Sequence, residues 1–134
     1  MRVVLDTNVV ISALLFDGLP EKLLINAIAG SDQLILSTYI IAETIRILET
    51  KFLVSTNNTE LLQQLLNEGE MVHFQPFLNV VADEPDNRII ETAIKGGAEY
   101  IITGDKLLLK LEKYNNLQII SVKQYFELSQ SYNK

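Results

Sequence analysis

The chain has 134 residues, 48% of them apolar and 21% charged, so it is predicted to form one globular domain over residues 1–134 rather than a disordered segment. It has no cysteine and a single histidine, which excludes disulfides, cysteine-bound metals and a metal site built on two histidines of one chain. A net charge of −6 argues against nucleic-acid binding by bulk electrostatics, so any such binding must be local. With no signal-peptide pattern and no apolar run of membrane-spanning length, we expect a cytoplasmic protein without membrane contact.

The chain begins with a pattern typical of a parallel sheet. Residues 2–5 are apolar after Arg2, and the run ends at Asp6, as expected of a strand covered on both faces. Helices are predicted over residues 9–16 and from Pro20, a favourable first helical residue, as far as Gly30.

A second strand, over residues 33–36, precedes a long predicted helix. Ser37 or Thr38 could cap this helix, which carries Glu43 and ends near Phe52. The elements predicted next are a polar loop over 55–58, an amphipathic helix over 61–69 and a strand over 71–74.

The second half of the chain repeats the alternation of strands and helices. An acidic loop over residues 81–87 leads into a helix that Asp86 is placed to cap and that Gly96-Gly97 closes. The remaining predicted elements are a strand over 100–103, a short helix over 107–111, a strand over 117–120 and a helix from Ser121 or Val122. Right-handed crossovers between such strands predict an α/β fold, a three-layer sandwich with a mostly parallel central sheet of about five strands flanked by helices.

Four acidic residues lie where a ligand site is expected. Ligands of open parallel sheets bind at the carboxyl ends of strands, where the strand order reverses. Asp6 and Asp105 each follow a predicted strand, Asp86 begins the helix before the second of these strands, and Glu43 lies one turn into the long helix. All four could reach one rim of the sheet.

Carboxylates gathered in this way repel one another unless a positive charge neutralises them. Oxygen ligands without histidine or cysteine suit a hard ion, so Mg²⁺ or Mn²⁺ is the expected metal. Such ions activate water and clamp phosphate groups, which is the chemistry of phosphodiester hydrolysis. Asn8 and Thr103 lie beside the predicted ligands and could orient carboxylates or water.

Each acid also has a purely structural interpretation. Asp6 could end a strand, Glu43 could be a solvated helix residue, Asp86 a plain N-cap and Asp105 a turn residue. Asp83 and Glu84 are interpreted as solvated loop acids, and His73 as a strand-end polar residue rather than a base. Five basic residues are loosely placed to contact phosphate or to form a solvated face: Arg46, Arg88, Lys106, Lys110 and Lys113.

Three segments together resemble the PIN-domain family, in particular its bacterial and archaeal toxin components of toxin–antitoxin systems. They are residues 5–12 (LDTNVVIS), 83–87 (DEPDN) and 98–105 (AEYIITGD), and the similarity covers nearly the whole chain in order. The resemblance implies an RNA-cleaving, Mg²⁺- or Mn²⁺-dependent ribonuclease that commonly forms a homodimer and is often silenced by a cognate antitoxin.

By motif position, the resemblance assigns metal-binding and catalytic roles to Asp6, Glu43, Asp86 and Asp105. Asn8 and Thr103 match the usual polar neighbours of these acids. Two features depart from the family pattern: Leu107 stands where many relatives have a further acid, and the order Asp-Glu-Pro-Asp at 83–86 replaces Asp-Pro-Asp-Asp. The sequence therefore does not decide between one metal ion and two.

Two other functions fit parts of the pattern. A non-catalytic PIN-like module that binds RNA or a protein would account for the missing acid at Leu107. A phosphatase of the haloacid dehalogenase type also begins with an aspartate at a strand end, but its chemistry requires a second aspartate two residues later, where this chain has Asn8.

Overall fold

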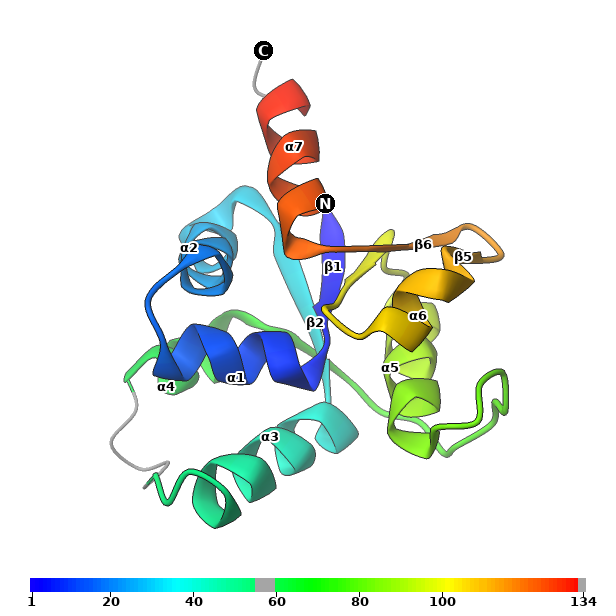
Figure 1. Cartoon of the computed structure of the whole chain (residues 1–134), viewed down its shortest axis with the longest axis horizontal. Helices are drawn as coiled ribbons and strands as arrows, with labels where there is room; N and C mark the ends of the chain where they lie inside the picture. Colours follow the sequence, from blue (N-terminus) through cyan, green and yellow to red (C-terminus); the bar gives the residue numbers. More distant parts are fainter. Residues whose placement is uncertain (55–59, 133–134) are drawn as a thin grey trace.

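Six strands form one sheet in the computed structural model, which describes residues 1–54 and 60–132 (Figure 1). Their order across the sheet is β3-β2-β1-β4-β6-β5, and every neighbouring pair is parallel except β5 with β6. The strands are β1 (Arg2–Leu5), β2 (Gln33–Ser37), β3 (Glu70–Val72), β4 (Tyr100–Ile102), β5 (Lys113–Tyr114) and β6 (Leu117–Ile120). The predicted α/β fold with a mostly parallel sheet is confirmed. The additional strand, β5, has only two residues and therefore no periodicity that could reveal it.

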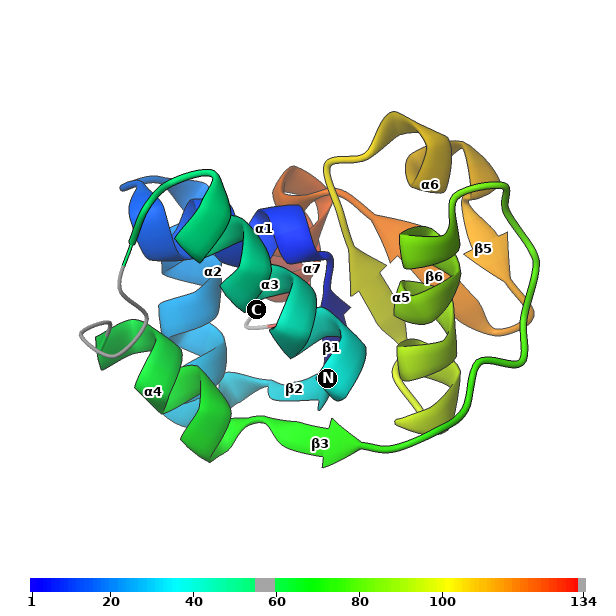
Figure 2. The same cartoon turned by 90° about the horizontal axis from the view of Figure 1, so that it is seen from below.

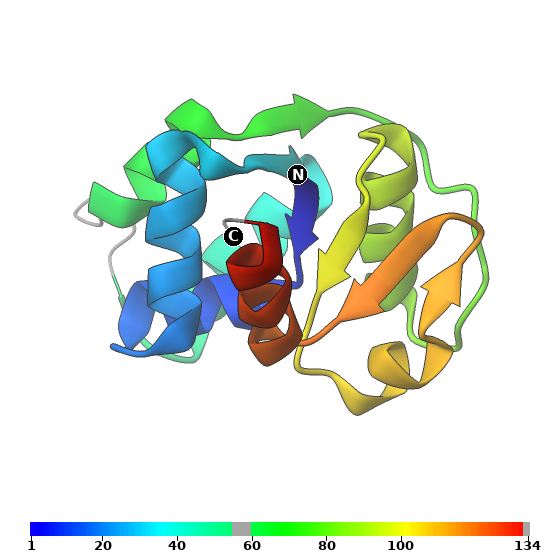
Figure 3. The same ribbon diagram turned by 90° about the horizontal axis from the view of Figure 1, so that it is seen from above.

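Helices cover both faces of the sheet. They are α1 (Thr7–Leu15), α2 (Leu19–Asn26) with the π-helical turn η1 (Ala27–Ser31), α3 (Thr38–Thr50), α4 (Glu60–Glu68), α5 (Glu84–Lys95), α6 (Lys106–Leu111) and α7 (Val122–Tyr132). Helices α1, α2, α4 and α7 pack on one face and α5 and α6 on the other, while α3 lies beside α1. Figure 3 shows α7 (red) and α5 (yellow-green) on opposite sides of the strands. Among the described helices, none combines the length and apolar character needed to cross a membrane.

The alternation of side chains along each strand separates the two apolar layers. In β1, Val3 and Leu5 pack with α1, α2 and α7, whereas Val4 faces the opposite way toward α5. Ile101 and Ile102 divide between the same two layers. Strands that are buried on both faces have little room for polar residues, which explains why β1 and β4 read as continuous apolar runs.

Two helix starts differ from the prediction. Helix α1 begins at Thr7, directly after Asp6, rather than at residue 9. The predicted N-cap at Asp86 is wrong, because α5 begins at Glu84 with Asp83 as its N-cap residue and Asp86 lies inside the first turn. Pro85 explains the earlier start, since its fixed φ favours the first turn of a helix. The polar loop predicted over 55–58 lies outside the described residues.

The chain changes direction across the sheet at β1. It runs outward from β1 through β2 to β3, then returns to the other side of β1 and adds β4 and β6. Strands β1 and β4 are therefore parallel neighbours from opposite ends of the chain, paired from Val3–Tyr100 to Leu5–Ile102. The crevice at the carboxyl ends of these two strands is where ligands of such sheets bind.

Candidate functional site

The ends of β1 and β4 bring Asp6 and Thr103 together. The Asp6 amide extends the pairing of the strands by donating to the Ile102 carbonyl at 2.9 Å, and the Thr103 amide does the same toward Ile120 at 2.9 Å. The first turn of α1 follows Asp6, and the loop to α6 follows Thr103. In Figure 1 the start of α1 and this loop both leave the sheet at the same edge.

All four acids singled out in the sequence line one cavity of about 240 Å³ at this edge. Asp6 comes from the end of β1, Glu43 from α3, Asp86 from the first turn of α5 and Asp105 from the start of α6. Asn8 also lines the cavity from α1. Thr103 is fully buried and acts on the cavity only through its neighbours.

The Thr103 hydroxyl links two of these acids. It donates a hydrogen bond to Asp6 Oδ2 at 2.6 Å and accepts one from the Asp105 amide at 2.9 Å. Because all partners are held by the ends of neighbouring strands, the hydroxyl fixes the orientation of the Asp6 carboxylate. This contact is of the orienting kind expected for Thr103.

Asp105 and Glu43 are engaged by their own helices. Asp105 is the N-cap of α6, and its Oδ1 accepts from the amides of Leu107 and Leu108 at 2.7 and 3.4 Å. Glu43 accepts two hydrogen bonds from the Arg46 guanidinium, at 2.7 and 3.1 Å, and these bonds are the main reason that the pKa of Glu43 lies below its usual value. Each carboxylate thus has a local structural contact as well as a place at the cavity.

The two most buried acids of the cavity have raised pKa values. Burial raises the pKa of Asp6 most, the Thr103 hydrogen bond opposes this, and the charge of Asp105 raises it further. Burial, followed by the charges of Asp83, Asp105 and Asp6, raises the pKa of Asp86 to about 7. Burial and the neighbouring carboxylates therefore both disfavour the ionised forms of Asp6 and Asp86 in the metal-free cavity.

Two charged residues of the cavity were not assigned to the site by the sequence analysis. Lys51 lines it at the end of α3, and Asp83, interpreted as a solvated loop acid, lines it as well. Glu43, Ile47 and Lys51 follow one another at intervals of four, which places them on one side of α3, and this spacing was the available signal. Of the basic residues proposed to contact phosphate, Arg46 pairs with Glu43 and Arg88 lines an adjoining hollow. Lys106, Lys110 and Lys113 are not among the residues that line the cavity.

The donor set of the cavity fits a hard divalent cation, since it consists of carboxylate and amide oxygens, and the carboxylates that surround Asp86 raise its pKa. Within residues 1–54 and 60–132, no three Asp, Glu or His side chains are arranged to hold one metal ion. Glu43 accepts hydrogen bonds from Arg46, and Asp105 Oδ1 accepts from the α6 amides, so both carboxylates already have partners within their own helices.

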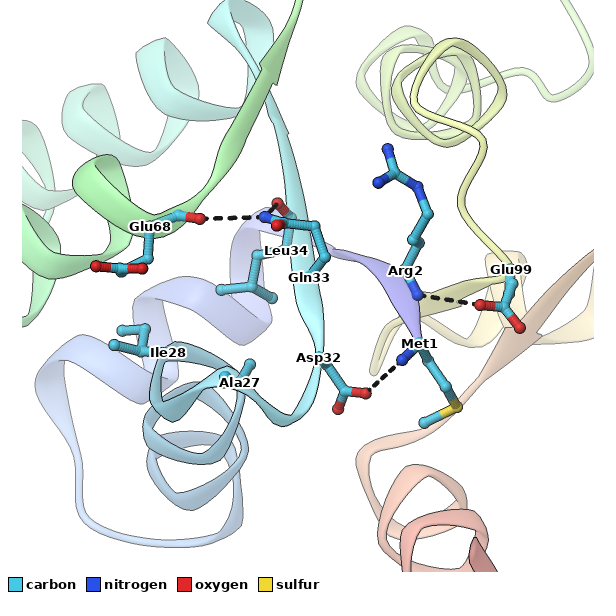
Figure 4. A pocket seen from close by; sticks show the side chains of 10 residues that line it. Met1, Arg2, Ala27, Ile28, Asp32, Gln33, Leu34, Glu68 and Glu99 are labelled. Carbon is cyan, nitrogen blue, oxygen red and sulfur yellow. Dashed lines mark hydrogen bonds and ion pairs between the residues drawn. The ribbon is translucent and has the colours of Figure 1, made fainter.

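A second hollow, of about 340 Å³, lies at the opposite ends of the strands (Figure 4). Its lining includes Met1, Arg2, Asp32, Glu68 and Glu99. Asp32 accepts from the Met1 amino group at 2.9 Å and also contacts the Tyr125 hydroxyl, and the Arg2 amide donates to Glu99 at 3.1 Å. These contacts tie the start of β1 to its neighbours and give this hollow a structural role.

Comparison with known proteins agrees with the architecture. The sequence model of the PIN domain matches residues 2–107, and the chain therefore belongs to the PIN-domain family. Its fold is similar to that of a chain in the crystal structure of VapBC2 from Rickettsia felis bound to a DNA fragment from their promoter. That alignment has a TM-score of 0.58 and 17% sequence identity, and covers 90% of this chain and 98% of the other. None of the curated proteins compared with this chain matches it.

Proposed function

We propose that this chain is a Mg²⁺- or Mn²⁺-dependent ribonuclease that hydrolyses RNA phosphodiester bonds. The observation that carries the proposal is the cavity at the ends of β1 and β4, where Asp6, Glu43, Asp86 and Asp105 meet in a PIN-domain chain. A divalent cation bound there would supply the activation of water and the neutralisation of phosphate charge.

The chain's own residues would position the reactants. Thr103 holds the Asp6 carboxylate in a fixed orientation, and the exposed Asn8 side chain can hydrogen-bond a water or a phosphate oxygen. Lys51 is the basic residue of the cavity lining and is placed to contact a phosphate of the RNA substrate. These roles require no histidine, and His73 is not among the residues that line the cavity.

Cleavage of a labelled RNA tests the assignment. In Mn²⁺ or Mg²⁺ we expect the unmodified chain to cleave the RNA, and Asp6→Asn and Asp105→Asn each to lower the rate to background. Asp17→Asn is the matched control, because Asp17 is an exposed acid that does not line the cavity. Cleavage that survives both cavity substitutions would refute the assigned site.

We further propose that the ribonuclease is the toxin of a toxin–antitoxin pair, cytoplasmic and homodimeric, with a cognate antitoxin as partner. The support is the similarity in fold to the VapBC2 structure. The same Asp6→Asn variant tests this part. Expression of the unmodified chain should arrest growth, the variant should not, and co-expression of the protein encoded beside it should relieve the arrest.

The alternative function is a non-catalytic PIN-like module that binds RNA or a protein. It is favoured by Leu107, which is exposed at the start of α6 where many family members have a further acid. The two proposals differ in whether the cavity binds an ion, and the thermal stability of the chain with and without Mn²⁺ separates them.

A further inference from the structure

Three aromatic side chains form a row beside the carboxylate cavity. The Tyr39 and Phe74 ring centroids are 5.2 Å apart with planes inclined at 33°, and those of Phe74 and Phe77 are 6.1 Å apart and nearly perpendicular. Lys95 Nζ lies 5.2 Å from the centroid of the Phe77 ring and ends the row. Tyr39 belongs to the first turn of α3, and the two phenylalanines belong to the segment 73–83 that joins β3 to α5, called the strap below (Figure 2).

The strap has an inward and an outward set of apolar side chains. Leu78, Val80 and Val81 pack against the core layer beneath α5, whereas Phe74 and Phe77 lie outside both core clusters of the described residues. Phe77 is 48% exposed, and Phe74 and Tyr39 are half-buried. The core therefore does not account for the aromatic row, which leaves large apolar surface available to a ligand.

Two further hollows, which are separate from the one at Met1, connect this row to the carboxylates. The first, of about 250 Å³, has Tyr39 and Arg88 in its wall and shares Thr7 and Glu43 with the carboxylate cavity. The second, of about 430 Å³, contains Tyr39 again together with Phe74. Tyr39 thus stands between the carboxylates on one side and the outer rings on the other.

The chemistry of this path suits a single nucleic-acid strand. Unstacked bases bind to aromatic rings whatever their sequence, and a nearby cation contacts the phosphates. Arg88 uses part of its guanidinium on Glu91 and the Leu78 carbonyl, and its side chain, which is 18% exposed, is the basic residue that lines the first hollow. The first hollow also contains two acids. Glu84 would repel a phosphate, whereas the charge of Glu43 is already paired with Arg46. For a chain of net charge −6, stacking supplies affinity that bulk electrostatics do not.

We propose that the aromatic row is a base-stacking subsite for single-stranded RNA, in which one base packs on Tyr39 and the next on Phe74 as the strand leaves the carboxylate cavity past Arg88. This inference rests on the proposed ribonuclease function. It restricts the substrate to single-stranded segments, because bases paired in a duplex do not present their faces to side chains.

Binding without metal tests the subsite independently of cleavage. The probe is a fluorescein-labelled single-stranded RNA of ten nucleotides, and its anisotropy is measured in EDTA. We expect Tyr39→Leu and Phe74→Leu each to raise Kd by about 5- to 100-fold. Tyr39→Phe, which keeps the ring, should stay within about twofold of the unmodified chain. Phe16→Leu removes an aromatic side chain that is exposed but lines neither the carboxylate cavity nor the two hollows beside it. This substitution should leave Kd unchanged.

Abasic substitutions in the RNA give a second measurement that does not depend on how well a variant folds. Abasic residues placed one at a time along the strand should weaken binding of the unmodified chain at one or two adjacent positions. If a base stacks on Tyr39, the same abasic residue should cost little in Tyr39→Leu. Equal penalties in both proteins, or unchanged affinity in both leucine variants, would overturn the proposal and leave the row as a surface for a protein partner.

The two proposals fail in different ways. An unmodified chain that binds the RNA through Tyr39 but never cleaves it in Mn²⁺ would refute the nuclease and leave the subsite intact. Cleavage with unchanged KM in the leucine variants would refute the subsite and leave the nuclease intact. We expect the variants to raise KM more than they lower kcat, because stacking outside the carboxylate cavity binds substrate and transition state equally.

Discussion

A single hydroxyl organises the candidate site. Thr103 has one proton to donate and gives it to Asp6, and it accepts from the Asp105 amide with its oxygen. The hydroxyl therefore fixes the Asp6 carboxylate at the end of β1 relative to the end of β4. Valine has nearly the same shape but could make neither contact, so the hydroxyl and not the volume of the side chain is what the site uses.

Asp86 shows the energetic cost of gathering carboxylates. It is 6% exposed and its pKa is raised, to about 7, by burial and then by the charges of Asp83, Asp105 and Asp6. A carboxyl group whose pKa is higher in the folded than in the unfolded chain destabilises the fold when it is ionised. Its favourable contribution is complete below the unfolded value, about 3.9, and is lost as the pH rises through about 7.

Replacement of Asp86 by asparagine should therefore stabilise the metal-free chain in a pH-dependent way. At pH 8 in EDTA we expect Asp86→Asn to raise the free energy of unfolding by ~3 kcal/mol, and at pH 4 by less than ~1 kcal/mol. Urea unfolding followed by circular dichroism at the two pH values measures the difference. The control, Asp17→Asn, changes an exposed acid and should have a small effect at both. A gain that is equal at pH 4 and pH 8 would contradict the proposed ionisation.

Helix α5 connects the candidate site to the strap. Its first turn carries Asp86, and the next residue, Asn87, accepts from the Val80 and Val81 amides at 2.9 and 3.0 Å and donates to the Val81 carbonyl at 2.8 Å. One turn later Glu91, which is fully buried, accepts from the amides of Phe77 and Leu78. Backbone groups of the strap are thus hydrogen-bonded by side chains of α5, in the way that a neighbouring strand would bond them in a sheet.

Glu91 should be far more important for stability than a carboxylate on the surface. It pairs with Arg88 out of contact with water, and loss of one member leaves the other charge unpaired. We expect Glu91→Gln to lower the free energy of unfolding by about 3 kcal/mol. Glu70→Gln is the matched control, because Glu70 also pairs with an arginine, Arg2, but lies at the surface, where such pairs contribute below about 1 kcal/mol. Equal losses in urea unfolding of the two variants would show that burial of the pair is unimportant.

The same pair marks a limit of sequence interpretation. Residues 88 and 91 read as an ordinary i,i+3 pair on a solvated helix face, because nothing local shows that a strap will cover them. The strands β1, β2, β4 and β6 could be predicted because burial on both faces leaves a local apolar signature. The start of α5 was misplaced because Asp83 and Asp86 are both acceptable caps, and only the backbone around Pro85 decides between them.

At the scale of the whole molecule, the candidate site depends on the order of strands. Asp6 and Asp105 could be assigned to one edge because each follows a strand of a parallel sheet, and the pairing of β1 with β4 places them together. The place of Lys51 at the cavity could not be found in this way, since it depends on how α3 lies beside α1 rather than on any strand end.

Binding of an ion at the cavity should stabilise the whole fold. A ligand that binds only the folded chain adds ~2.7 kcal/mol to its stability at 100 times Kd. We expect saturating Mn²⁺ to raise the Tm at pH 8 by several degrees, and not to do so in the double variant Asp6→Asn, Asp105→Asn. Sodium chloride at the same ionic strength controls for general screening. An unchanged Tm in the unmodified chain would favour the non-catalytic module over the ribonuclease.

The hydrogen bond between Thr103 and Asp6 joins residues 97 positions apart, across the seam where β4 returns beside β1. Contacts between such distant residues form slowly compared with local ones, because the entropy of closing a long loop is lost before the contacts form. The cavity cannot assemble until Asp105 has been synthesised, because its lining combines the end of β1 with the residues that follow β4. A fragment that stops before β4 therefore lacks Thr103 and Asp105 and cannot form the candidate site.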